Sequence, residues 1–92
     1  MTNPITVYSK TYTASADGAF QVEDEEHVWL KSANIHCFTN DAYYGNQGNL
    51  GGILRANAVI WFDAPFRPSD IWFKNYTPGS NCVIQIVGIY KD

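Results

Sequence analysis

The chain has 92 residues, of which 46% are hydrophobic, 15% aromatic and only 16% charged, and its net charge is −3. This hydrophobic content excludes a disordered tail, and the length corresponds to a single domain over residues 1–92. The acidic balance and six scattered cations argue against a nucleic-acid-binding surface, and the low charge predicts that a partner covers part of the surface.

The N-terminal segment predicts a strand over residues 5–13. Few of its inward positions are apolar, so the strand is weakly amphipathic. We therefore expect residues 1–14 to form an edge strand or an arm that orders against a partner. A turn at residues 17–18 (Asp-Gly) then leads to a short strand over residues 19–22.

A longer strand is predicted over residues 27–38. It follows the acidic run 23–26, which we interpret as a solvated loop. Leu30 lies on one parity of this strand and Cys37 on the other, although both are apolar. One β-bulge near residues 32–34 would bring both side chains to the same face.

Glycine and proline punctuate the middle of the chain. Residues 40–52 contain four glycines and three asparagines, which argues against a regular central strand and favours a long loop, either ordered and functional or a mobile insertion. Strands are predicted over residues 53–63 and 71–75. The two prolines within residues 64–69 require an extended connection between them.

The C-terminal end carries the clearest pattern. Residues 77–80 (Thr-Pro-Gly-Ser) predict a type II turn, which would join strand 71–75 to a final strand, 82–90, as a hairpin. The final strand is apolar on both parities, so its second face is expected to meet a neighbouring subunit. The spacing of strands and turns predicts an all-β domain, an antiparallel β-sandwich or jelly roll of about six to eight strands with little or no helix.

The chain shows no catalytic constellation. A nucleophile elbow, a phosphate-binding loop and an HExxH motif are absent, and His36 and Cys37 point to opposite faces of a strand. Cys37 and Cys82 are interpreted as buried reduced thiols, with a disulfide left open if their strands are neighbours. The cysteines and histidines lack the paired spacing of a zinc site. We expect no enzymatic activity, no metal and no cofactor.

Three aromatic doublets, at residues 43–44, 61–62 and 72–73, are the distinctive feature of the sequence. Successive side chains of a strand face opposite ways, so Trp61 and Trp72 point outward if the phenylalanines enter the core. Other parts of the chain, a subunit interface or a sugar stacked on the rings would cover them. The candidate interface or ligand surface comprises Trp61, Trp72, Tyr43, Tyr44, Phe66, Tyr76, Val83, Val87 and Ile89.

Residues 51–90 resemble the C-terminal parts of small tailed-bacteriophage virion proteins, namely head decoration or cement proteins and related head or tail components. The likeness is carried by residues 70–75 (DIWFKN), 78–81 (PGSN) and 87–88 (VG). In that family these segments correspond to an aromatic strand, a Gly-containing turn and an apolar strand that ends in V-x-G, where this chain has Val87-Gly88.

The resemblance implies a capsid decoration or cement protein, commonly a homotrimer, that binds the major capsid protein or other virion proteins. The resemblance also implies a location in the virion after synthesis in the host cytoplasm. The N-terminus lacks a signal-peptide pattern and no apolar run would cross a membrane, so synthesis in a cytosol is expected. Nucleic-acid and membrane partners are not expected. A carbohydrate-binding, lectin-like module and a tail or fibre component remain as alternatives.

Overall fold

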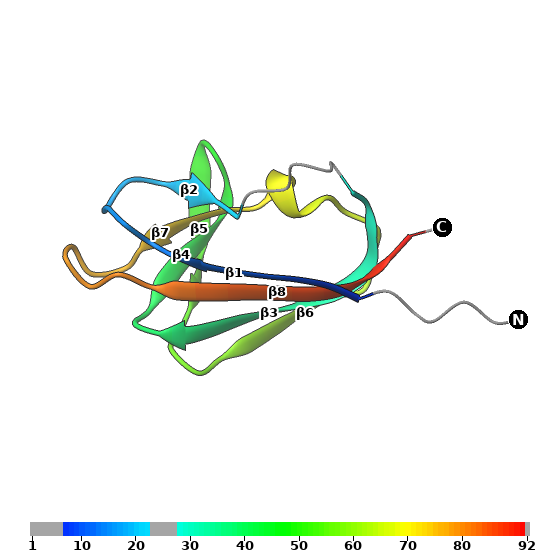
Figure 1. Cartoon of the computed structure of the whole chain (residues 1–92). Coiled ribbons are helices and arrows are strands. Elements are labelled where there is room, and N and C mark those ends of the chain that lie inside the picture. Colours follow the sequence, from blue (N-terminus) through cyan, green and yellow to red (C-terminus); the bar gives the residue numbers. More distant parts are fainter. Residues whose placement is uncertain (1–6, 23–27, 92) are drawn as a thin grey trace, which may run out of the picture.

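The computed structural model describes residues 7–22 and 28–91, which form two facing antiparallel sheets (Figure 1). The acidic run 23–26 and the first part of the predicted N-terminal arm lie outside the described residues. Sheet A contains β1 (Val7–Thr13), β8 (Val83–Tyr90), β3 (Leu30–Thr39) and β6 (Val59–Phe62), in that order across the sheet. Sheet B contains β2 (Phe20–Gln21), β7 (Trp72–Asn75), β4 (Ala42–Asn46) and β5 (Asn49–Leu54).

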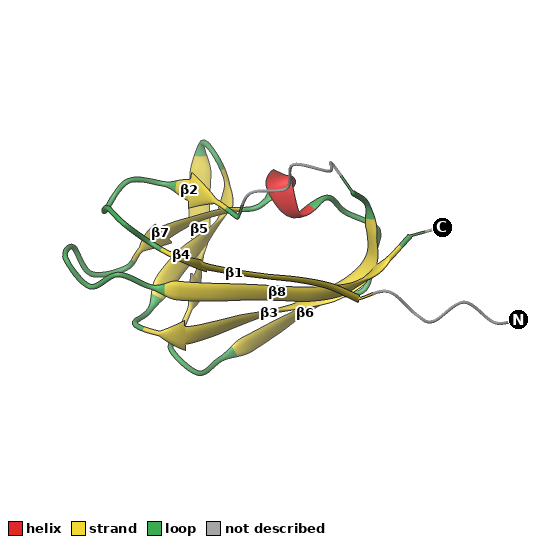
Figure 2. Cartoon of the chain, in the orientation of Figure 1, coloured by secondary structure: helices red, strands yellow, loops and turns green. Residues whose placement is uncertain are grey.

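The strand pairing is that of a jelly roll. β1 pairs with β8, β2 with β7, β3 with β6 and β4 with β5, all antiparallel, as if one long hairpin had been folded over. β3 also pairs with β8, and β4 with β7, which completes the two sheets. In the described part of the chain, the helical element is one 3₁₀ turn, Pro68–Asp70 (Figure 2). The predicted all-β sandwich is therefore confirmed.

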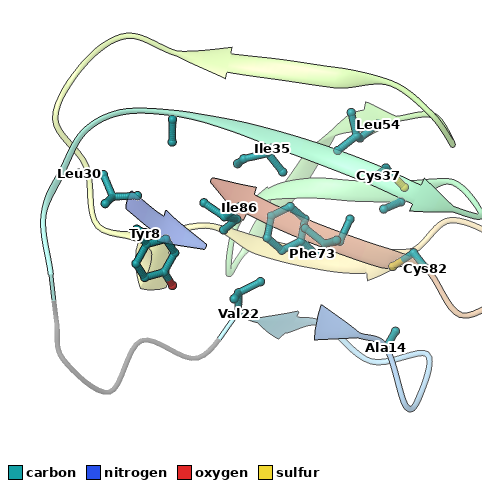
Figure 3. Packing of buried hydrophobic residues seen from close by; sticks show 13 residues of the cluster. Tyr8, Ala14, Val22, Leu30, Ile35, Cys37, Leu54, Phe73, Cys82 and Ile86 are labelled. Carbon is teal, nitrogen blue, oxygen red and sulfur yellow. The ribbon is translucent and has the colours of Figure 1, made fainter. Parts of the chain in front are cut away.

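The core fills the space between the two sheets. Ile84 and Ile86 of the inner strand β8 are fully buried, as their alternation predicts, and both belong to one cluster with Phe73 of sheet B. Figure 3 shows Ile86 beside Phe73. Full burial of one such side chain contributes about 1.5–3 kcal/mol. The other side chains that are essentially inaccessible to solvent include Leu30, Ile35, Cys37, Leu54 and Cys82.

A bulge places both halves of β3 in this core. The pairing of β3 with β8 shifts between Leu30 and Ser32, so Leu30 and Cys37 are both buried despite their opposite parity. The bulge predicted near residues 32–34 is thus confirmed within a residue. A second shift lies between Cys37 and Thr39, which the sequence did not indicate.

The prediction of a loop over residues 40–52 is wrong. This segment forms the β4–β5 hairpin, and β4 is an inner strand of sheet B. Two of its glycines occupy positions in the strand pairing where a side chain would be unfavourable. Gly45, with φ +153°, lies at the register shift of the hairpin, and a Cβ on Gly52 would approach the Tyr44 ring to 2.5 Å.

The predicted C-terminal hairpin is also wrong, although its turn is confirmed. Gly79 has φ +82° and the Ser80 N–H donates to the Thr77 carbonyl at 3.0 Å. However, β7 belongs to sheet B and β8 to sheet A, so the turn passes the chain between sheets. The single strand predicted over residues 53–63 is likewise divided, with Asn57 at φ +70° where the chain leaves sheet B for sheet A.

A buried amide holds this crossing end of the sandwich together. Asn75 is 3% exposed, and its Oδ1 accepts a hydrogen bond from the Cys82 N–H at 2.9 Å. The two hydrogens of its Nδ2 are shared among three acceptors, Asn81 Oδ1 at 3.0 Å, Asp17 Oδ1 at 3.1 Å and the Ala16 carbonyl at 3.3 Å. One side chain therefore connects β7 to the start of β8 and to the β1–β2 loop.

Replacing this amide tests its role. Asn75→Ala leaves the Cys82 N–H buried without its acceptor, so we expect a loss of about 1–3 kcal/mol in the free energy of unfolding. Urea denaturation monitored by circular dichroism measures the loss. The matched control, Asn46→Ala, alters an exposed asparagine of β4. Equal stability of the two variants would contradict this role.

The two cysteines are buried free thiols, as predicted. The Cys37 thiol donates to the Asn40 carbonyl at 2.8 Å. Burial, followed by the neighbouring Cys82, raises the pKa of Cys37 to about 11, and burial also raises the pKa of Cys82. The reactive thiolate form is therefore scarce at neutral pH.

Alkylation checks this assignment. At pH 8 we expect iodoacetamide to leave both cysteines of the native protein unmodified and to modify both in urea, as measured by intact mass. Rapid modification of the native protein would show that the thiols are accessible and contradict the buried state.

Candidate interaction surface

The outer face of sheet A is defined by strand alternation. Because Ile35, Ile84 and Ile86 point into the core, the side chains between them point outward. The ladder pairing places these outward side chains side by side across the sheet. They are Val7, Ser9, Thr11 and Thr13 of β1; Val83, Gln85, Val87 and Ile89 of β8; Ser32, Asn34, His36 and Phe38 of β3; and Val59 and Trp61 of β6. We call this set the neutral face.

The neutral face contains no Asp, Glu, Lys or Arg. Two exposed lysines flank it, Lys31 at the bulge of β3 and Lys10 on the edge strand β1. In the part of the chain that the structure describes, seven large hydrophobic side chains are at least 40% exposed, and five of them lie on the neutral face. These five are Val7, Phe38, Val59, Ile89 and Trp61, the last being 75% exposed.

A hollow of about 240 Å³ opens on the neutral face. Its floor is the backbone of neighbouring β3 and β8 residues, Ala33 and Gly88, since the position of a Cβ on Gly88 faces the core. Its walls are Val7, Ser32, Asn34, Trp61, Val87 and Ile89. An exposed indole thus borders a largely apolar depression, an arrangement suited to receiving an apolar group.

A second cluster lies at the end of sheet B. Asp41 accepts hydrogen bonds from the Arg55 guanidinium at 2.7 Å and from the Ala56 N–H at 2.8 Å. The guanidinium also lies 4.9 Å from the centre of the Tyr76 ring, and that ring packs against Tyr43 at 4.9 Å. The charged groups of this cluster are therefore paired with each other, and the Arg55 guanidinium covers one side of the Tyr76 ring.

Acid titration tests the Asp41 contacts. The Ala56 N–H and then the Arg55 side chain lower the pKa of Asp41 below its ordinary value of about 3.9. A lowered folded-state pKa contributes stability above the unfolded-state pKa, and this is lost as pH falls through the folded-state pKa. Asp41→Asn should therefore be less stable at pH 7 and lose less stability below about pH 4. Parallel profiles of Tm against pH for variant and wild type would contradict this.

The predicted surface residues separate into four groups. Trp61, Val83, Val87 and Ile89 lie together on the neutral face, whereas Tyr43 and Tyr76 belong to the cluster at sheet B. Trp72 is half-buried and shares the outer side of β7 with Lys74. The remaining two, Tyr44 and Phe66, pack against the core, with Phe66 5.2 Å from the ring of Phe62.

One exposed tryptophan, Trp29, is not among the residues predicted from the sequence. Trp29 is 48% exposed and lies beside two cations, Arg67 at 5.4 Å and Lys91 at 5.9 Å from its ring. Strand alternation could have predicted this, because an inward Leu30 places the adjacent Trp29 side chain outward. Trp29 lies just before the start of β3, whereas the other exposed tryptophan, Trp61, pairs with Asn34 near the middle of β3. The two side chains therefore lie on different parts of the surface.

Among residues 7–22 and 28–91, no group of three His, Cys, Asp or Glu side chains could hold a metal ion. Within the same residues, no helix has the length and apolar character needed to cross a membrane. No protein-family model, no curated protein and no solved structure matches the chain. The function is therefore inferred from the surface itself.

Proposed function

We propose that this domain is a non-enzymatic structural protein of a virus particle, a decoration protein that binds a bacteriophage head and stabilises it. Two features support the proposal besides the resemblance of residues 51–90. The jelly roll is a fold that viral capsid domains use, although lectins and cupins share it. The neutral face offers a surface that assembly would cover.

The neutral face carries the proposal as a surface for assembly, which a subunit of the head or another copy of this protein would cover. A partner can cover it without removing the hydration of any Asp, Glu, Lys or Arg on this side, which is the costly part of most interfaces. Trp61 is 75% exposed, and covering ~100 Å² of apolar surface contributes about 2.5 kcal/mol. Aromatic side chains surrounded by uncharged residues are typical of the centres of protein interfaces.

Carbohydrate binding is the second candidate, and one observation favours it. Asn34 and Ser32 line the hollow beside Trp61, so hydrogen-bonding groups and an open aromatic ring occur together, as a sugar site requires. The rings of Tyr43 and Tyr76 offer less, because they pack on each other and the Arg55 guanidinium lies over the Tyr76 ring. A glycan array separates the two candidates, since saccharide binding that Trp61→Ala abolishes would favour the lectin.

Head binding tests the proposal directly. The purified protein is mixed with undecorated heads of the virus that encodes it, and bound copies are counted by cryo-electron microscopy. We expect saturable, stoichiometric occupancy of lattice sites and greater resistance of the heads to heat. Empty lattice sites at saturating protein, together with normal heads in a virus lacking the gene, would overturn the decoration role. Binding to tails instead would assign a tail or fibre position.

A further inference from the structure

We infer that the neutral face is covered by a second copy of this chain, packed face to face so that Trp61 of each copy enters the hollow of the other. This deepens the proposed function and rests on it in treating the neutral face as an assembly surface. It names the partner at that face and leaves the head to be bound by the remaining surface.

The charge distribution favours a second copy. Each chain carries a net charge of −3, so two copies repel each other, and their contact costs least where it brings no like charges close together. In a two-fold contact the same patch meets itself, so a charged residue near the axis meets its own kind. The neutral face avoids this, since Lys10 and Lys31 lie at its margins.

Trp61, which we call the knob, and the hollow lie on one face, so two copies of that face can be complementary to each other. The strand that carries Trp61, β6, lies at one edge of sheet A and β1 lies at the other (Figures 1 and 2). The hollow begins at Trp61 and is lined further by residues of β3, β8 and β1. A two-fold axis parallel to the strands and between β3 and β8 lays β6 of each copy over β1 of the other. Trp61 then lies above the β1 side of the other copy's hollow, which Val7 lines. The axis passes beside the paired residues Asn34 and Val87. The strands of the two copies then run nearly aligned, the usual arrangement of stacked sheets about 10 Å apart.

This arrangement closes at two copies. Knob and hollow share one face, so the contact is isologous and completes itself, whereas the trimer implied by the resemblance would need two different patches. The face spans four strands about 4.8 Å apart and up to seven residues of about 3.3 Å, or roughly 400 Å² in projection. A standard interface buries about 800 Å² per partner. We therefore expect a weak dimer that dissociates at micromolar concentrations.

Sedimentation velocity of the full chain over a hundredfold concentration range tests the inference. The wild type should pass from monomer to dimer. Trp61→Glu alters the knob and Val87→Glu the hollow, and each should weaken dimerisation at least tenfold while circular dichroism stays native. The matched control, Ile53→Glu, alters a residue of sheet B that is 46% exposed and should dimerise like the wild type.

Three results would overturn the inference: a wild type that stays monomeric throughout, a trimer that persists in Trp61→Glu, or dissociation by Ile53→Glu alone. Head binding, measured in parallel, separates this inference from the proposed function. If the protein forms the dimer but does not bind heads, the dimer inference stands and the decoration role fails. If the protein stays monomeric and binds heads, the decoration role stands and the dimer inference fails.

Discussion

The structure depends on one constraint, which is that β8 is an inner strand of a two-layer sandwich yet is apolar on both sides. Strand alternation sends Ile84 and Ile86 into the core and leaves Val83, Val87 and Ile89 on the outer face of sheet A. The jelly roll places β1 and β3 beside β8, so its outer residues become the middle of a broad face. Since no second layer of this chain covers that face in the described residues, its apolar groups are available to a partner.

The jelly-roll connectivity explains why the surface is continuous while its strands are distant in sequence. The chain crosses between the sheets at nearly every connection, and the Asn75 amide stabilises one crossing by bonding to Cys82, Asn81 and the Asp17 loop. Because β6 and β1 are brought to opposite edges of sheet A, an exposed indole and an apolar hollow come to share one face. Assembly at that face therefore depends on long-range pairing far from Trp61.

Within a strand, the alternation of inward and outward side chains could be predicted from the sequence. Which strands pair with each other could not, and the wrong predictions concern pairing. Outward Trp61, inward Phe73 and the bulge of β3 followed from parity alone. The sequence could not show that the Pro-Gly turn changes sheets, because its local geometry is the same in a hairpin and in a crossing. Nor could composition show that Gly52 makes room for the Tyr44 ring, since this depends on register. The hollow was unpredictable for the same reason, since it forms among residues of four strands.

The central claim is that the neutral face is buried when the protein assembles. A variant with Trp29 and Trp72 replaced by Phe retains Trp61 as its one tryptophan, since the chain has three. Its fluorescence therefore reports on that face alone. The emission maximum should shift to shorter wavelength as the concentration rises or as the protein joins its assembly, because the indole leaves water. An emission maximum that stays at the value of a hydrated indole in the dilute, concentrated and assembled protein would contradict the account.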